Sequence, residues 1–372
     1  MGKNNNKKYS GHQFAPQPTL TVPKRSRKNL TPSNFVTNSP ETMTTTTAET
    51  SPIIWPAMGC GTWAWGNKLL WGYQPAMDGE LQKVFDQCVS AGITFFDTGD
   101  SYGTGRLQGQ SEKLLGKFSQ VYGGKNEEKI CLATKLAPYP WRLTAQAMVK
   151  AGLASAERLQ RPIDLVQLHW STANYAPWQE KPLLKGLGQL CRQGHAKALG
   201  LSNFGPKRLR AAHDFCQNEG VKIASLQVQY SLLSTDPVSK LGLKDLCDQL
   251  DIKLIAYSPL TLGLLTGKYG PQGPFPKGIR GLLFRQLIPK IKPLLDTLQA
   301  IAEGRQKTMA QVALNWCICQ GTMPIPGAKK CQQVQDNLGA LGWQLDSGEM
   351  EELNRQAASL PQTMVQNIFQ SR

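Results

Sequence analysis

The sequence predicts an α/β fold, a (β/α)8 TIM barrel that follows a disordered N-terminal extension, and three observations support this prediction. From residue 51 onward, short apolar segments alternate with longer segments whose apolar residues recur at helical spacing. There are eight such pairs, whereas a doubly wound dinucleotide-binding domain needs about six strands. Polar residues follow several of the apolar segments, at the strand ends that form the active face of a barrel.

The eight apolar segments are the expected strands, and they cover residues 57–62, 94–98, 130–135, 165–169, 196–203, 225–230, 253–258 and 322–326. The expected helices lie between and after them, and they cover residues 79–90, 110–118, 144–159, 182–192, 206–218, 240–249, 289–303, 308–319 and 331–338. We expect residues 51–345 to form the barrel and residues 346–372 to form a C-terminal helix and tail.

A glycine-rich segment tests the alternative of a Rossmann domain. Gly103 and Gly105 follow an expected strand and precede an expected helix, as the dinucleotide motif G-x-G-x-x-G requires. The third glycine would have to stand at position 108, which is Gln108. The segment is therefore interpreted as a flexible loop.

Residues 1–50 have a different composition from the rest of the chain. They are rich in Asn, Ser, Thr, Pro and Lys and cannot bury enough apolar surface to fold, so we expect disorder. The segment is basic and hydroxyl-rich, and it lacks the apolar region of a secretory signal. These features favour an organelle transit peptide, with a disordered linker or a nuclear signal at residues 24–28 as alternatives. Without a transit peptide the protein would be cytoplasmic.

Charge and composition exclude several classes of function. The formal net charge is +16, which favours an anionic cofactor or substrate. Nucleic-acid binding is not expected, because no zinc-finger, basic-zipper or RNA-recognition motif is present. No apolar run is long enough to span a membrane. The nine cysteines form no C-x-x-C pair and the four histidines form no H-E-x-x-H motif, so no metal site is expected.

Four polar residues are the candidate catalytic group. Asp97, Lys135 and His169 end the second, third and fourth expected strands, and Tyr102 lies in the loop after Asp97. Strand ends meet at one rim of a barrel, so these side chains are expected to converge. Burial of a lone lysine or aspartate is costly, and Asp97 and Lys135 can pair. The alternative is a structural ion pair beside an unrelated histidine and a packed tyrosine.

This group suits proton donation to a carbonyl oxygen. A free tyrosine has a pKa of about 10, and a neighbouring ammonium such as that of Lys135 would lower it. Asp97 would keep Lys135 charged and in place. His169 would orient the carbonyl group by hydrogen bonding to its oxygen. Tyr102 is thus the predicted general acid.

Several motifs in residues 58–341 resemble those of the aldo-keto reductases. They are Gly61-Thr62-Trp63, Asp97 with Tyr102, Thr134-Lys135, Leu168-His169-Trp170, Gly200-Leu201-Ser202-Asn203-Phe204, Tyr257-Ser258-Pro259-Leu260, Gly267-Lys268-Tyr269 and Ile325-Pro326-Gly327-Ala328-Lys329. The resemblance implies an NADPH-dependent reductase in which Tyr102 is the acid, helped by Lys135, Asp97 and His169. Hydride would pass from the nicotinamide to a carbonyl carbon.

The resemblance also implies a set of cofactor-binding residues. They are Gly61, Thr62 and Trp63, then Ser202, Asn203 and Gln227 at the carboxamide, Tyr257 stacked on the nicotinamide, Ser258, Pro259, Leu260, Gly263 and Lys268 at the pyrophosphate, and Gly327, Lys329, Gln333 and Asn337 at the adenosine. Gln333 stands where many family members have an arginine for the 2′-phosphate. Lys329 and Lys330 can still bind that group as point charges, so we expect NADPH rather than NADH.

A narrower set of motifs is similar to plastid members of the family in plants that reduce the aldehyde of pyridoxal to the alcohol of pyridoxine. These motifs are residues 61–67, 139–144, 282–286, 315–319 and 367–370. The similarity implies vitamin B6 salvage in the plastid stroma. It also implies that an aromatic mouth formed by Trp63, Trp65, Tyr139, Trp141 and Trp170 stacks on the pyridine ring.

Two alternatives to this function stay open. One is a reductase of broad specificity for small aldehydes, which would not prefer pyridoxal. The other is a regulatory subunit that binds NADPH without significant turnover. In each case the expected partner is a small molecule, and the oligomeric state is left open.

Overall fold

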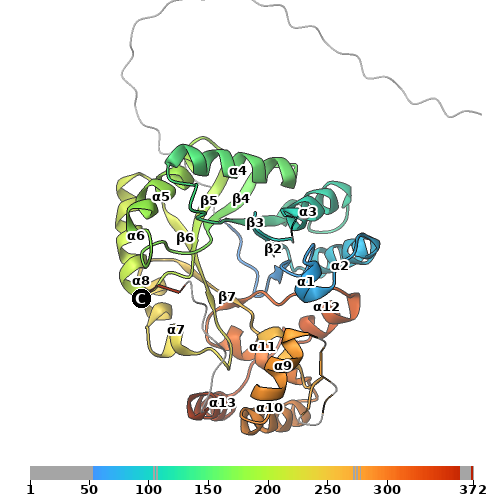
Figure 1. Cartoon of the computed structure of the whole chain (residues 1–372). Helices are drawn as coiled ribbons and strands as arrows, with labels where there is room; N and C mark the ends of the chain where they lie inside the picture. The colour runs from blue at the N-terminus through green and yellow to red at the C-terminus, as the bar shows by residue number, and fades with distance from the viewer. Residues whose placement is uncertain are drawn as a thin grey trace, which may run out of the picture. The chain divides into compact units, whose positions relative to one another are not determined.

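The computed structural model describes residues 53–103, 105, 108–270, 273, 275–276, 278–360 and 370–371. Within these residues, eight parallel strands form one sheet in sequential order (Figure 1). The strands are β1 (Cys60–Gly61), β2 (Phe95–Asp97), β3 (Cys131–Leu136), β4 (Ile163–Leu168), β5 (Ala196–Ser202), β6 (Ile223–Gln229), β7 (Lys253–Tyr257) and β8 (Met323–Pro324). The prediction of a (β/α)8 barrel is confirmed. The disorder predicted for residues 1–50 lies outside the described residues.

Backbone contacts close the barrel between the first and the last strand. Gly59 N donates to Pro324 O at 3.0 Å and Gly61 N donates to Pro326 O at 3.2 Å. A Cβ atom at Gly61 would lie 2.9 Å from Ile325 O, which is closer than real Cβ contacts allow. Glycine at this position therefore permits the close approach of the two short strands.

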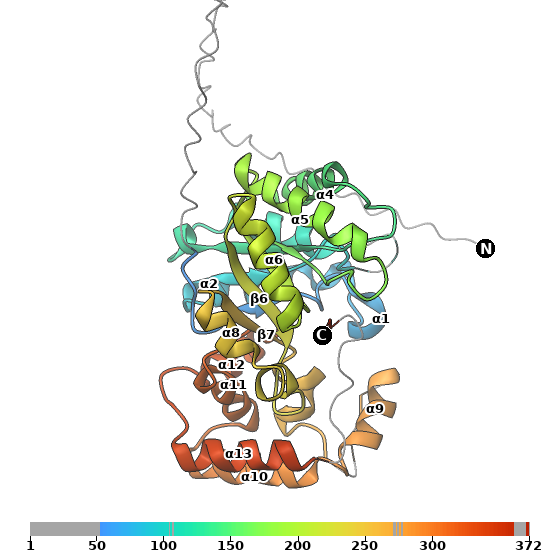
Figure 2. The ribbon, with the colours of Figure 1, turned by 90° about the vertical axis from the view of Figure 1, so that its left-hand side faces the viewer.

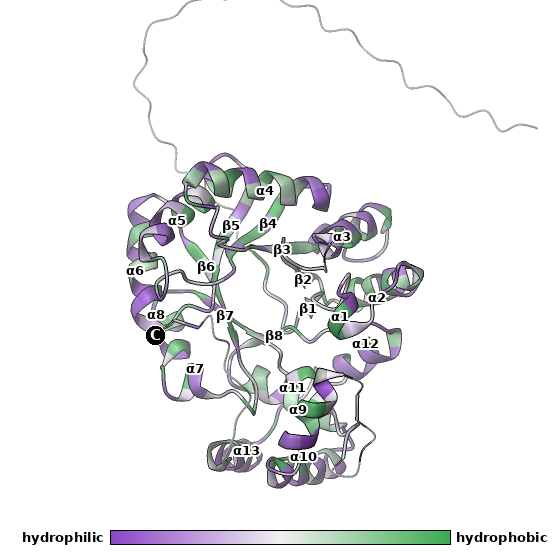
Figure 3. Cartoon of the chain, in the orientation of Figure 1, coloured by the Kyte–Doolittle hydropathy of each residue, from purple (hydrophilic) through white to green (hydrophobic). Residues whose placement is uncertain are grey.

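The helices cover the outside of the barrel. They are α2 (Asp78–Ser90), α3 (Gln110–Val121), α4 (Ala145–Leu159), α5 (Pro177–Arg192), α6 (Pro206–Asn218), α8 (Leu243–Gln249), α10 (Lys292–Gly304), α11 (Met309–Cys319), α12 (Cys331–Leu338) and α13 (Ser347–Ser359). Figure 2 shows α10 and α13 side by side. In Figure 3 green apolar segments are visible on β4 and β7, and the outer helices carry both apolar and polar residues. None of the helices in the described residues combines the length and the apolar character that crossing a membrane requires.

Three short helices were not predicted, namely α1 (Lys68–Trp71), α7 (Asp236–Ser239) and α9 (Ile279–Leu287). Helix α5 also begins earlier than expected. The sequence pattern predicts Pro182 as its first residue, but Pro177 occupies the first turn and Pro182 lies inside the helix. Proline is favoured in a first turn, and the sequence alone does not decide which of two nearby prolines is used. The proposed division into residues 1–50, 51–345 and 346–372 stays a prediction, although α13 does lie in the last of these segments.

The buried residues form two clusters that separate the inside of the barrel from its outer layer. Phe95, Ala133, Leu165 and Ile255 belong to a small cluster inside the barrel. Their neighbours along the strands pack instead in a larger cluster with the helices. Successive residues of a strand point to opposite faces. Residues two positions beyond the inner ones, toward the carboxyl ends of the strands, therefore point inward as well.

Candidate active site

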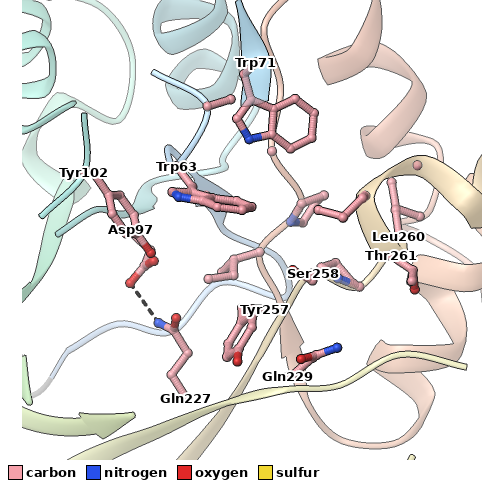
Figure 4. Close-up of a pocket in the computed structure, with 18 of the residues that line it drawn as sticks. Trp63, Trp71, Asp97, Tyr102, Gln227, Gln229, Tyr257, Ser258, Leu260 and Thr261 are labelled. Atoms are coloured by element: carbon pink, nitrogen blue, oxygen red, sulfur yellow. Dashed lines mark hydrogen bonds between the residues drawn. The ribbon is translucent and has the colours of Figure 1, made fainter. Parts of the chain in front are cut away.

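The alternation along the strands places the candidate catalytic side chains on the inner face. Asp97 is two residues beyond Phe95 on β2, and Lys135 is two beyond Ala133 on β3. His169 directly follows β4, and Tyr102 lies in the loop after β2. All four line one cavity of about 620 Å³ at the carboxyl ends of the strands, and Figure 4 shows Asp97 and Tyr102 there. The predicted convergence of these four residues is found in the structure.

Asp97 and Lys135 form a buried ion pair. The Lys135 ammonium also donates to Thr98 O at 2.9 Å. The second carboxylate oxygen of Asp97 accepts hydrogen bonds from Gln227 Nε2 at 2.8 Å and from Gln167 Nε2 at 3.0 Å. Every charged atom of the pair is thus hydrogen-bonded, as buried charges require. Gln167 was missed in the sequence, where its signal is an inward-facing position two residues before His169.

Tyr102 and Lys135 lie close enough to interact. The Lys135 Nζ atom is 5.0 Å from the centroid of the Tyr102 ring. The pKa of Tyr102 nevertheless lies above its ordinary value in this structure, whereas the sequence pattern predicts a lowered one. Burial raises the pKa of the phenol well above its ordinary value of 10.0, and the Asp97 carboxylate raises it further. Tyr102 therefore keeps its proton at neutral pH, which is the form that a proton donor needs.

His169 also lies beside Tyr102. The two rings meet edge to face, with centroids 5.8 Å apart. Burial holds the pKa of His169 well below its ordinary value of 6.5, and the Lys135 ammonium lowers it further. The imidazole is therefore neutral at pH 7. Ser101 Oγ lies 3.4 Å from His169 Nδ1, and when Ser101 donates to Nδ1 the ring proton is on Nε2.

A second ion pair fixes the loop that carries Tyr102. Arg142 Nη1 lies 2.5 Å from Asp100 Oδ2 and donates to Ala137 O at 2.6 Å. Asp100 Oδ1 accepts from Ala137 N at 3.1 Å, and Asp100 N donates to Lys135 O at 2.9 Å. These contacts tie the loop to the end of β3. Arg142 stands in one of the motifs of the sequence, but its pairing with Asp100 was not predicted.

Polar residues at the ends of β5, β6 and β7 continue the cavity. Ser202, Asn203, Gln227 and Tyr257 all line it. Asn203 Nδ2 donates to Ser202 Oγ at 3.1 Å, and Tyr257 Oη donates to Asn203 Oδ1 at 3.0 Å. Asn203 has a φ of 62°, a left-handed conformation that Asn tolerates better than most residues. The predicted carboxamide-binding residues therefore lie together.

The loop after β7 has an unusual backbone. Ser258, Thr261, Leu262 and Gly263 have φ values of 53°, 50°, 56° and 99°. Left-handed conformations are uncommon for residues other than glycine, and such strain clusters at functional sites. The whole segment 258–263, which includes Pro259 and Leu260, lines the cavity. It is the loop that the sequence predicts for a pyrophosphate.

Besides Lys135, three cationic side chains line the same cavity. They are Lys268, Arg280 and Lys329. Arg280 Nη2 donates to Leu262 O at 3.0 Å. Burial lowers the pKa of Lys329, and the neighbouring Arg280, Lys330 and Lys268 lower it further. Grouping like charges is unfavourable without an anion, so this end of the cavity suits phosphate groups. Arg280 was missed, because it lies in α9, a helix that was not predicted.

The remaining predicted cofactor residues fall into two groups. Gly61, Trp63, Gly327 and Gln333 line the cavity, whereas Thr62 and Asn337 are buried outside its lining. The Thr62 hydroxyl donates to Asp97 O at 2.9 Å, so it holds the backbone of β2.

The predicted aromatic mouth is also divided. Trp63 and Trp170 line the cavity. Tyr139 and Trp141 lie outside its lining and stack on each other, with centroids 4.6 Å apart. Trp65 was wrongly assigned to the mouth. Its side chain is completely buried and donates from Nε1 to Ala328 O at 2.8 Å, so it belongs to the core.

Figure 4 shows the side chains around Tyr102 in the cavity. Tyr102 and Asp97 lie on one side, with the hydrogen bond from Gln227 to Asp97 beneath them. Trp63 and Trp71 lie above, and Tyr257 and Ser258 lie opposite Tyr102. A proton donor therefore shares one cavity with a cationic region. Among the described residues, no group of three or more His, Cys, Asp or Glu side chains is arranged to hold a metal ion.

Comparison with known proteins agrees with this geometry. The profile of the Aldo/keto reductase family matches residues 57–357. The chain is 52% identical over 337 residues to the chloroplastic pyridoxal reductase of Arabidopsis thaliana, covering 86% of this chain and 92% of that protein. It is 27% identical to an NADP(+) aldo-keto reductase of Schizosaccharomyces pombe, covering 80% of this chain and 87% of that protein.

Solved structures show the same fold. The aldo-keto reductase of Klebsiella pneumoniae, solved in complex with NADPH, superposes with a TM-score of 0.64 and 23% sequence identity. The alignment covers 84% of this chain and 95% of that chain.

Proposed function

The chain belongs to the aldo/keto reductase family, and from this premise we propose that it reduces the aldehyde of pyridoxal to the alcohol of pyridoxine with NADPH. It is an oxidoreductase of that family. One observation carries the proposal. The protonated Tyr102 and the ion pair of Asp97 with Lys135 lie in the same cavity as the polar residues at the ends of β5 to β7 and the cations Lys268, Arg280 and Lys329.

The residues of the cavity fit a dinucleotide. The carboxamide has partners in Ser202, Asn203 and Gln227, and Tyr257 offers a planar ring. The left-handed loop 258–263 and the cations Lys268, Arg280 and Lys329 suit the phosphate groups. Three cations at one end favour NADPH, which carries one more phosphate than NADH. Arg280 offers the guanidinium that is absent at position 333.

The mechanism follows from the protonation states of the side chains. NADPH, when bound, supplies the hydride that the carbonyl carbon accepts. The Tyr102 phenol donates its proton to the carbonyl oxygen, so that an alcohol forms and a phenolate is left. The Lys135 ammonium, 5.0 Å from the Tyr102 ring, stabilises that phenolate. Neutral His169 orients the carbonyl oxygen by donating a hydrogen bond. A proton from solvent then restores Tyr102.

Aromatic side chains support a planar substrate. Trp63 and Trp170 line the cavity, and the stacked pair of Tyr139 and Trp141 follows β3 in the same group of loops. A pyridine ring can pack against such surfaces. The 52% identity to the Arabidopsis pyridoxal reductase supports pyridoxal among planar aldehydes.

The same relative supports a location. Its name places it in the chloroplast, and residues 1–50 of this chain are basic, hydroxyl-rich and poor in acidic residues. We infer that residues 1–50 are a transit peptide and that the barrel begins near residue 51. A fluorescent protein fused after residue 50 should enter plastids, and diffuse cytoplasmic fluorescence would contradict this inference.

A substrate comparison tests the proposed reaction. We expect the purified protein to oxidise NADPH in the presence of pyridoxal with a higher kcat/KM than with benzaldehyde. Equal values for the two aldehydes would instead support a broad-specificity reductase. NADPH binding without turnover of any aldehyde would support a regulatory subunit.

A further inference from the structure

Helix α1 holds a tryptophan at the edge of the cofactor region. The helix has four residues, and both of its ends are capped locally. Asn67 Oδ1 accepts a hydrogen bond from Leu70 N at 3.0 Å, and Gly72, with a φ of 66°, donates from its backbone to Lys68 O at 3.0 Å. The last residue of the helix is Trp71, which lines the cavity. The two caps therefore fix where this short helix begins and ends.

The Trp71 indole lies beside three side chains, two of which come from segments that are distant in sequence. Arg280 lies over it, with the guanidinium carbon 4.6 Å from the ring centroid. The Lys329 ammonium lies 5.5 Å from the same ring and donates to Trp71 O at 3.0 Å. Trp63 meets it edge to face at 6.0 Å. Trp71 thus connects α1 with α9 and with the loop after β8 across the cationic end of the cavity.

Two hydrogen-bond donors in this cluster have no acceptor in the described part of the chain. They are Trp71 Nε1 and Arg280 Nε, and both are buried. Buried N–H groups are rarely left without an acceptor, because each one costs about 1–3 kcal/mol. The two donors come from different segments and lie beside Lys268 and Lys329, which line the same cavity. This combination suits a ligand that accepts hydrogen bonds and carries negative charge.

We propose that Trp71 is a cofactor-binding residue, whose Nε1–H donates to a phosphate group of the dinucleotide while its ring, packed against Arg280 and Lys329, retains the cofactor in the cavity. The proposal rests on the proposed binding of NADPH. It extends that binding site to α1, a segment outside the residues that the sequence motifs imply. The phosphate is either the pyrophosphate or the 2′-phosphate, and NADH, which lacks the 2′-phosphate, distinguishes the two.

The Trp71→Phe variant tests the donor, because it keeps an aromatic ring and removes the N–H group. The matched control is Trp178→Phe, since Trp178 lies on α5 with 71% of its surface exposed, outside the cavity lining. Dissociation constants for NADPH and NADH are measured by fluorescence titration, and NADPH release is measured by stopped flow. We expect Trp71→Phe to weaken NADPH binding about tenfold, mainly through faster release, and Trp178→Phe to leave it unchanged.

The two nucleotides locate the phosphate. If Trp71→Phe binds NADPH and NADH more weakly by the same factor, Trp71 donates to the pyrophosphate. If only NADPH binding is weakened, Trp71 donates to the 2′-phosphate. The Arg280→Lys variant keeps the charge and removes the Nε donor, and it should also weaken NADPH binding. Unchanged affinity in Trp71→Phe would overturn the proposal. Failure of the unmodified protein to bind NADPH would instead overturn the proposed function.

Discussion

The Lys135 ammonium lies 5.0 Å from the centre of the Tyr102 ring, and on its other side it is paired with the buried Asp97 carboxylate. This arrangement gives the two charged groups different effects on the phenol. The carboxylate raises the pKa of Tyr102 together with burial, so the proton is held before reaction. The ammonium has the opposite effect, because it attracts the phenolate that proton transfer leaves behind, and it thereby eases donation of the proton to the carbonyl oxygen.

The first prediction concerns the proton donor itself. Tyr102→Phe removes the hydroxyl group and keeps the ring, so NADPH binding should persist. Reduction of pyridoxal should fall by about 10²- to 10⁴-fold, which is the usual contribution of a general acid. Steady-state rates and NADPH affinity measure the two effects. The control is Tyr122→Phe, which removes a hydroxyl that donates to the nearby Lys125 carbonyl. Reduction by Tyr102→Phe at the rate of the unmodified protein would remove the acid assignment.

The second prediction concerns the ion pair beneath Tyr102. Lys135→Met leaves the Asp97 carboxylate buried without its partner, so the free energy of unfolding should fall by about 3–5 kcal/mol. The double variant Asp97→Asn with Lys135→Met removes both charges and should recover part of that stability. Neither variant should recover the activity. Urea unfolding and pyridoxal turnover measure the two quantities.

A different outcome for the double variant would change the interpretation of this pair. Recovery of activity along with stability would show that Lys135 acts on folding alone. No recovery of stability would show that Lys135 stabilises the protein through packing rather than through its charge.

The barrel and the catalytic group could be predicted because they depend on local rules. Successive side chains of a strand point to opposite faces of the sheet. Once the register of a strand is set, the side of the barrel to which Asp97 or Lys135 points is therefore determined. The eightfold repeat of strand and helix then brings those ends together. The residue ranges of most helices could also be predicted, because the apolar residues of each helix recur on one face.

Other features depend on tertiary contacts that a motif does not specify. Trp63 and Trp65 stand two residues apart in one loop, yet the first lines the cavity and the second is buried in the core. Loops lack the fixed alternation of strands, so the sequence did not separate the two. Arg280 and Trp71 lie on short helices whose place is set by contacts with distant residues. The raised pKa of Tyr102 comes from enclosure by the whole site.

The third prediction concerns the neutral imidazole. Burial lowers the pKa of His169 in the folded protein, while the unfolded chain has the ordinary value of 6.5. Below pH 6.5 the unfolded state binds a proton that the folded state does not, so stability falls as the pH falls, by at most about 1.4 kcal/mol per pH unit. His169→Gln cannot bind that proton. It should therefore lose less stability than the unmodified protein between about pH 7 and about pH 5.

The measurement is urea unfolding at the two pH values, with His213→Gln as the control because His213 lies on α6, outside the cavity lining. We expect the control to show the same pH dependence as the unmodified protein. An identical loss of stability in His169→Gln would mean that His169 does not resist protonation in the folded state.

The last prediction concerns two neighbouring lysines to which the sequence analysis assigns the same role in binding the cofactor. Both Lys329 and Lys330 were expected to bind the 2′-phosphate, but only Lys329 lines the cavity, whereas Lys330 is exposed outside its lining. Lys329→Met should weaken NADPH binding about tenfold and NADH binding less, because the lost charge faces the end of the cavity that suits phosphates. Lys330→Met should change neither. Dissociation constants for both nucleotides test this, and equal losses in the two variants would show that long-range charge, rather than contact, determines the preference for NADPH.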